Sequence, residues 1–152
     1  MTLYRIAKKK YVDDLSGAGA RIYGGRWNHK GIGMLYTSEG RALATVEYLV
    51  HVPLSIVPSD LSIAFIEIPD DIIPTQVSTA QLPANWRDYP APPELAKIGT
   101  RWAIESRSLL LRVPSAVIAG EFNVLINPAH TDIRHVEITH IEDCRLDQRL
   151  LR

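Results

Sequence analysis

The chain has 152 residues, and its 17 lysines and arginines balance 17 aspartates and glutamates, which gives a formal net charge of +0 at pH 7. This balance argues against nucleic acid or an anionic membrane surface as the main partner. A hydrophobic fraction of 46% over this length is sufficient for a core that needs no disulfide or metal to hold it. We therefore expect one domain over residues 1–152.

The cellular compartment can also be predicted. Cys144 is the only cysteine and cannot form an internal disulfide, so a reducing compartment is expected. No apolar run approaches the length of a membrane-spanning helix. The N-terminus lacks the apolar segment of a signal peptide. Together these features predict a cytoplasmic protein.

The first part of the chain contains short strands, loops and one clear helix. Arg5 lies inside the first strand, and Pro53 ends the helix because proline cannot continue the helical hydrogen bonds. The elements expected here are a strand at 2–6, a loop at 13–20, a strand at 34–37, a helix at 39–51 and a connector at 54–59.

The second part opens with an alternating strand at 61–68, whose phase shifts near Phe65. Such a shift indicates a bulge or a strand buried on both faces. Residues 69–93 are irregular and rich in proline, and a loop this long in a compact domain is often functional. The remaining expected elements are a helix at 94–107, which Gly99 could kink or divide, and strands at 109–113, 116–118, 123–126 and 136–141.

Residues 24–51, GGRWNHKGIGMLYTSEGRALATVEYLVH, are the most informative stretch. Gly24 and Gly25 allow a positive φ or a close approach of the backbone to a ligand. Arg26 offers a rigid fork of donors that suits phosphate or carboxylate. Ser38 or Glu39 is expected to cap the helix that follows.

One apolar face is expected on that helix. Ala42, Val46, Leu49 and Val50 recur at helical spacing. At 3.6 residues per turn, Glu47 lies about 100° from the centre of this face, on its flank. A carboxylate there is either half-buried against a cation or part of the wall of a cleft.

Several common kinds of site are not supported. The chain has no phosphate-binding glycine loop of the Walker or GxGxxG type and no GxSxG nucleophile elbow. The histidines do not have zinc-site spacing with Cys144, so we expect no metal site. The cysteine near the polar C-terminal tail is interpreted as incidental.

Five residues remain as candidates, and each has a structural alternative. Arg26 and Glu47 could form a structural ion pair, which perturbs pKa values without catalysis. Tyr36 could be a core aromatic whose hydroxyl is tied to the backbone, and Ser115 could be a turn residue. Arg5 is the fifth candidate.

The order of motifs GGRWNHKG, LYTS, ATVEYLVH and VPSAVIAGEFNVLINPAH resembles the RES domain family. These are bacterial toxins named for arginine, glutamate and serine, usually encoded beside an Xre-type antitoxin. The resemblance covers nearly the whole chain. It implies an α+β fold of one domain, with short mixed and antiparallel strands in a split sheet and packed helices, similar to ADP-ribosyltransferases.

The resemblance also implies a chemistry. Family members consume NAD+, so NAD+ is expected as a substrate and no cofactor is required. Arg26, Tyr36 and Glu47 match the catalytic residues of the family and Ser115 matches its serine. The implied NAD-binding residues are Arg5, Arg26, Tyr36, Ser115 and Asn123.

The implied reaction is cleavage of the nicotinamide–ribose bond by a glycohydrolase or phosphorylase. The alternatives are transfer of ADP-ribose to a protein and a module that binds a nucleotide or a partner without turnover. The expected protein partner is a cognate Xre-type antitoxin that occludes the cleft between Arg26 and Glu47, with Trp86 and Tyr89 as contacts. The sequence leaves open whether two copies form a homodimer.

Overall fold

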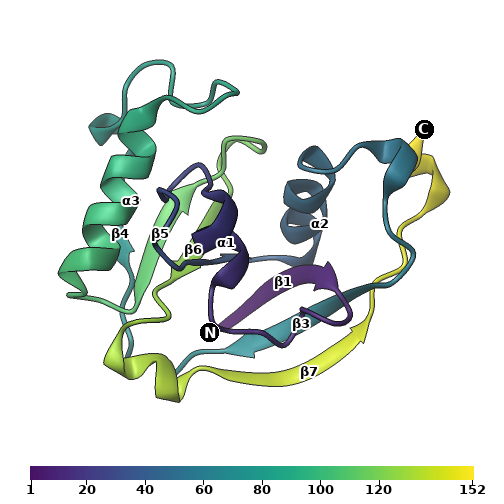
Figure 1. Cartoon of the computed structure of the whole chain (residues 1–152), viewed down its shortest axis with the longest axis horizontal. Helices are drawn as coiled ribbons and strands as arrows, with labels where there is room; N and C mark the ends of the chain where they lie inside the picture. Colours follow the sequence, from purple (N-terminus) through teal and green to yellow (C-terminus); the bar gives the residue numbers. More distant parts are fainter.

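The computed structural model describes all residues, 1–152, as an α+β domain with one mixed sheet (Figure 1). The seven strands lie in the order β4-β5-β6-β2-β1-β3-β7, and every neighbouring pair is antiparallel except β4 with β5. The strands are β1 (Thr2–Lys8), β2 (Leu35–Ser38), β3 (Leu61–Glu67), β4 (Thr75–Gln76), β5 (Leu110–Pro114), β6 (Phe122–Ile126) and β7 (Glu137–Asp143). The helices are α1 (Ala18–Tyr23), α2 (Arg41–Val50) and α3 (Pro93–Glu105).

The sheet is split between β1 and β2, as predicted. These two strands share a single residue pair, Tyr4 opposite Ser38. By contrast, β1 pairs with β3 along its whole length, and β2 pairs with β6 from Leu35 to Ser38. The sheet therefore consists of a β1–β3–β7 half and a β2–β6–β5–β4 half that diverge on either side of one contact.

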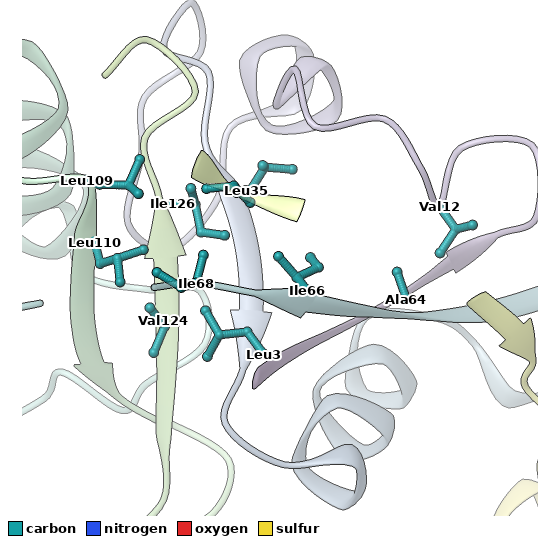
Figure 2. Close-up of a cluster of buried hydrophobic side chains, with 11 residues drawn as sticks. Leu3, Val12, Leu35, Ala64, Ile66, Ile68, Leu109, Leu110, Val124 and Ile126 are labelled. Atoms are coloured by element: carbon teal, nitrogen blue, oxygen red, sulfur yellow. The ribbon is translucent and has the colours of Figure 1, made fainter. Parts of the chain in front are cut away.

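Each face of the sheet has its own core, because successive side chains of a strand point to opposite faces. Leu110, Val124 and Ile126 belong to a cluster that runs under both halves of the sheet (Figure 2). Leu111 and Leu125, one position along, belong to a second cluster with α3. In Figure 1, α3 lies beside β4 and β5, whereas α2 lies near β1.

α3 is continuous through Gly99, which does not divide it. The glycine is needed for another reason: a Cβ built at this position would lie 1.8 Å from the carbonyl oxygen of Trp27. The helix thus packs directly against the backbone of the loop that follows Arg26, which fixes the position of that loop.

Most of the expected strands are present within two or three residues of their predicted bounds. The phase shift near Phe65 is a bulge, because the pairing of β3 with β7 changes register between Phe65 and Ile66. No helix of the structure has both the length and the apolar composition needed to cross a bilayer.

Three local predictions were wrong. Residues 116–118 form bends and not a strand, because the N–H groups of Val117 and Ile118 donate to the Ser115 hydroxyl. α1 occupies part of the predicted 13–20 loop; it begins after Gly17 and buries no residue fully, so it has no apolar pattern. α2 is preceded by Gly40 and has no side-chain cap, contrary to the role given to Ser38 or Glu39.

Candidate active site

A cavity of about 420 Å³ lies at the split of the sheet, between β1 and β2 and bordered by α1 and α2. Its size is within the range of small-molecule sites. Five of the six residues predicted from the sequence line it: Arg5, Arg26, Tyr36, Glu47 and Asn123. They come from β1, the loop between α1 and β2, β2 itself, α2 and β6. The fold therefore gathers side chains that are far apart in the sequence.

Glu47 is held in the cavity wall by two neutral donors. The Ser115 hydroxyl donates to Oε1 of Glu47 over 2.7 Å, and Nδ2 of Asn123 donates to the same oxygen over 2.6 Å. Oε2 has no protein partner, and since no buried side-chain oxygen lacks one, Oε2 is accessible from the cavity. The arrangement fixes one carboxylate oxygen and leaves the other free for a ligand.

Ser115 does not line the cavity but supports Glu47 from behind. Its side chain is buried, with 1% of its surface exposed. Its hydroxyl oxygen accepts the N–H groups of Val117 and Ile118, so its single proton is directed at Glu47. Ser115 is therefore both the turn residue of the structural alternative and a donor to the candidate site.

The predicted packing face of α2 was wrong. The buried residues of this helix are Leu43 and Ala44, whereas Val50 is 53% exposed. Glu47 follows Leu43 by one turn, so it lies on the face that packs toward the sheet and not on its flank. With this face of α2 turned to the sheet, the carboxylate of Glu47 lies within hydrogen-bond distance of Ser115 and Asn123.

Arg26 is not the ion-pair partner of Glu47. Its Nη1 donates to the carbonyl of Trp86 over 2.8 Å, and its Nη2 donates to the carbonyl of Asp88 over 3.1 Å. No ion pair joins it to Glu47. Burial lowers the pKa of Arg26, and the negative charge of Glu47 opposes that shift. The guanidinium therefore anchors the proline-rich loop to the cavity wall, with N–H groups still free for a ligand.

Arg5 has a similar double role. Its Nη1 donates to the carbonyls of Tyr11 and Val12, over 2.8 and 2.7 Å, so it anchors the segment after β1. Burial lowers its pKa, opposed by the charges of Asp14 and Asp13. Two partly buried guanidinium groups therefore line one cavity, which favours an anionic ligand.

Tyr36 contributes its ring to the cavity, while its hydroxyl is engaged elsewhere. The hydroxyl donates to Oδ1 of Asn28 over 2.6 Å and accepts the N–H of Trp27 over 3.1 Å. Burial raises the pKa of Tyr36 well above its ordinary value, so the hydroxyl stays neutral. A Cβ at Gly25 would lie 2.6 Å from this hydroxyl, which explains why a glycine is required there.

Two buried polar residues near the cavity were not predicted as site residues, and Ser38 was named only as a helix cap. Asn28 is 2% exposed and its Nδ2 donates to the carbonyls of Ala20, His29 and Ile32. Ser38 is 4% exposed and donates to Oδ1 of Asn123 over 2.7 Å. Both stand inside motifs that were recognised, GGRWN and LYTS, but nothing in one sequence marks them as buried.

Carboxylates, histidines and the cysteine do not gather elsewhere. No group of three or more His, Cys, Asp or Glu side chains is arranged to hold a metal ion. The cavity is lined by one carboxylate, two guanidinium groups and several aromatic side chains, among them Tyr36.

The sequence that builds this split sheet and its cavity also matches a protein-family model. The model of the RES domain aligns with residues 2–147, and the chain belongs to the RES domain family. The resemblance predicted from the motifs is confirmed.

Relatives in this family share a large part of the sequence. The chain is 38% identical over 148 residues to the Prs ADP-ribosylating toxin of a Sphingobium species, an alignment that covers 96% of this chain and 92% of the relative. It is 42% identical over 131 residues to the protein Toxin Res of Yersinia enterocolitica, with 86% of each chain covered. These relatives are toxins of nearly the same length.

A solved structure shares the fold. The chain is similar to a chain in the crystal structure of the M. tuberculosis MbcT-MbcA toxin-antitoxin complex, with a TM-score of 0.72 and 20% identity over 99% of this chain and 86% of that chain. This likeness confirms the predicted α+β architecture.

Proposed function

We propose that the chain is the toxin of a bacterial toxin–antitoxin system and that it consumes NAD+ by cleaving the nicotinamide–ribose bond. The observation that carries the proposal is Glu47 itself. Its carboxylate lines a cavity, is held by the neutral donors Ser115 and Asn123, and forms no ion pair. The carboxylate is thus oriented by neutral groups, and one of its oxygens is left without a protein partner and open to a ligand.

The chemistry needs that charge. As the bond between the ribose carbon and the pyridinium nitrogen breaks, its electron pair moves to the nitrogen and nicotinamide leaves as a neutral molecule. The ribose acquires oxocarbenium character, as in glycoside cleavage. A fixed carboxylate beside it stabilises the developing positive charge or holds a ribose hydroxyl. No acid is needed for the leaving group.

The other candidate residues suit the rest of the substrate. The free N–H groups of Arg5 and Arg26 match the oxygens of a pyrophosphate. The ring of Tyr36 is in position to stack on the nicotinamide or the ribose, and its fixed hydroxyl holds the ring still. These roles make Arg26, Tyr36 and Glu47 the catalytic set of the proposal.

The test is incubation of the purified protein with NAD+ and measurement of free nicotinamide. Release at a rate well above a Glu47→Gln control supports the proposal, and no release refutes it. Product analysis with and without phosphate then identifies the acceptor: ADP-ribose indicates water, and ADP-ribose 1″-phosphate indicates phosphorolysis.

A second candidate function is transfer of ADP-ribose to a protein. It is favoured by the relative from Sphingobium, which is named an ADP-ribosylating toxin. NAD+ labelled in the adenylate part distinguishes the two reactions. Label that becomes bound to protein indicates transfer, whereas label that remains in small molecules indicates degradation. A module that only binds would release no nicotinamide in either assay.

We further propose an Xre-type antitoxin that covers the cavity between Arg26 and Glu47. Tyr89 suits a contact, because 86% of its side chain is exposed on the loop that Arg26 anchors. Trp86 is less suitable, since it packs against the α3 core. A complex whose cavity stays open to solvent would contradict this arrangement. The mass of the free protein in solution decides whether it is a homodimer.

A further inference from the structure

Ser38 lies at the only residue pair that joins the two halves of the sheet. It faces Tyr4 of β1 on one side and Asn123 of β6 on the other. Directly opposed residues of neighbouring strands point to the same face and lie close enough for their side chains to interact. The position of Ser38 is therefore fixed by strand pairing on both sides.

The Ser38 hydroxyl continues the hydrogen-bond chain that ends at Glu47. It donates to Oδ1 of Asn123 over 2.7 Å, and Nδ2 of the same amide donates to Glu47 Oε1 over 2.6 Å. A donor on the amide oxygen polarises the amide and strengthens its N–H as a donor. Each link is short, and each runs in the same direction toward the carboxylate.

Without this hydroxyl, the Asn123 amide loses its support. Asn123 Oδ1 has no other protein donor, so removing the hydroxyl leaves an acceptor without a partner at the cavity wall. The Asn123 amide is then expected to rotate toward another donor, because an acceptor without a hydrogen bond costs free energy. A turned amide no longer aims Nδ2 at Glu47, and Ser115 alone does not fix the carboxylate against rotation about its last bond.

We propose that Ser38 is a positioning residue of the reaction, which acts through the Asn123 amide to set where Glu47 presents its free oxygen. This inference rests on the proposed NAD+ cleavage at Glu47. It does not require Ser38 to touch the substrate, because its proton is engaged with Asn123.

The test is a double-mutant cycle on the full chain, made by cell-free synthesis. Nicotinamide release is measured for wild type, Ser38→Ala, Asn123→Ala and the double variant. We expect kcat of Ser38→Ala to fall about five- to tenfold, the effect of losing about one hydrogen bond, with KM changed less than about twofold. In the Asn123→Ala background, Ser38→Ala should cause no further fall, since its effect passes through the missing amide.

A second variant separates chemistry from packing. Ser38→Thr keeps the hydroxyl and should retain kcat within about threefold, whereas Ser38→Ala has the smaller side chain and should not. Melting temperatures of all variants show which are folded, and rates are compared for the folded fraction.

The outcomes are distinct. If wild type releases no nicotinamide, the proposed function fails and this inference with it. If wild type is active, the inference alone is overturned by a Ser38→Ala kcat equal to wild type, by an equal fall in both backgrounds, or by a change confined to KM.

Discussion

Replacement of Glu47 by glutamine is the sharpest test of the site. The amide oxygen of glutamine can still accept from Ser115 and Asn123 at the positions that Oε1 occupies, so the wall of the cavity keeps its shape. What is lost is the negative charge that the two carboxylate oxygens share, and an NH2 group takes the place of the oxygen that has no protein partner. Loss of one preorganised electrostatic group typically costs about 10²–10³ in rate, or roughly 3–4 kcal/mol of transition-state stabilisation.

The same structure limits the effect on folding. Two hydrogen bonds to a charged oxygen become two hydrogen bonds to a neutral one, a difference of about 1 kcal/mol in the free energy of unfolding. The variant should therefore be folded, with a melting temperature a few degrees from wild type, and no longer toxic when expressed alone. Glu137→Gln, at an exposed position of β7, is the matched control and should keep full activity.

The decisive measurement pairs the nicotinamide release rate with the melting temperature. A folded Glu47→Gln protein with near wild-type turnover would refute the catalytic role. If the glutamate were only structural, activity would fall in proportion to the folded fraction and no further. A large fall in rate with an intact melting curve is what the geometry predicts.

Three other substitutions test neighbouring parts of the structure. Arg26→Ala should raise the KM for NAD+ about tenfold or more, because a donor to the anionic part of the substrate is lost. The same variant should show faster proteolysis of the loop at 83–90, which Arg26 anchors. An unchanged KM would argue against a role of Arg26 in binding. Gly99→Ala should destabilise the fold by about 2–3 kcal/mol in chemical denaturation, because the new methyl meets the Trp27 carbonyl. Tyr36→Phe should cost about 1–3 kcal/mol, since it leaves two buried partners unpaired, while activity of the folded protein stays within about threefold. The folded-state pKa of Tyr36 is raised, so its contribution is complete below the unfolded pKa of about 10 and is lost as the pH rises above it. Stability at pH 11 relative to pH 8 should therefore fall more in wild type than in Tyr36→Phe.

The sequence predicted which residues lie together better than it predicted the details of the fold. Arg26, Tyr36 and Glu47 stand in short motifs with distinctive residue types, and their convergence in one cavity was implied by the family resemblance. The phase shift near Phe65 indicated a bulge or a strand buried on both faces, and the structure has a register shift after Phe65 and consecutive buried residues before it.

The failures have physical causes. The apolar residues of α2 gave a packing face at Ala42 and Val46, but tertiary contacts with the sheet select the face of Leu43 and Ala44. α1 has six residues and buries none of them fully. Its sequence therefore has no apolar residues at helical spacing from which a helix could be predicted. The bends after Ser115 arise from a hydroxyl that accepts two backbone N–H groups, and residue propensities do not record such contacts.

The contact between Arg26 and the proline-rich loop was equally out of reach. Its acceptors are the backbone carbonyls of Trp86 and Asp88, which every residue type carries. The sequence suggested a phosphate of the ligand or the carboxylate of Glu47 as the partner of Arg26, because charged groups are the partners that side-chain types indicate. Backbone carbonyls can be assigned as hydrogen-bond acceptors only when the position of the proline-rich loop in the fold is known.

The split of the sheet has a consequence for how the site tolerates change. Arg5 stands on the β1–β3–β7 half and Asn123 on the other, while Glu47 lies on α2, which contacts both β1 and β2. The two halves are joined directly by one residue pair, so their relative twist is set mainly by the packing of α2 and of the two cores. The spacing between the anion-binding side and the carboxylate side is therefore a property of the whole domain. Substitutions deep in either core can change this spacing without altering any residue that contacts the ligand. Packing at a hinge changes the width of a cleft between two domains in the same way.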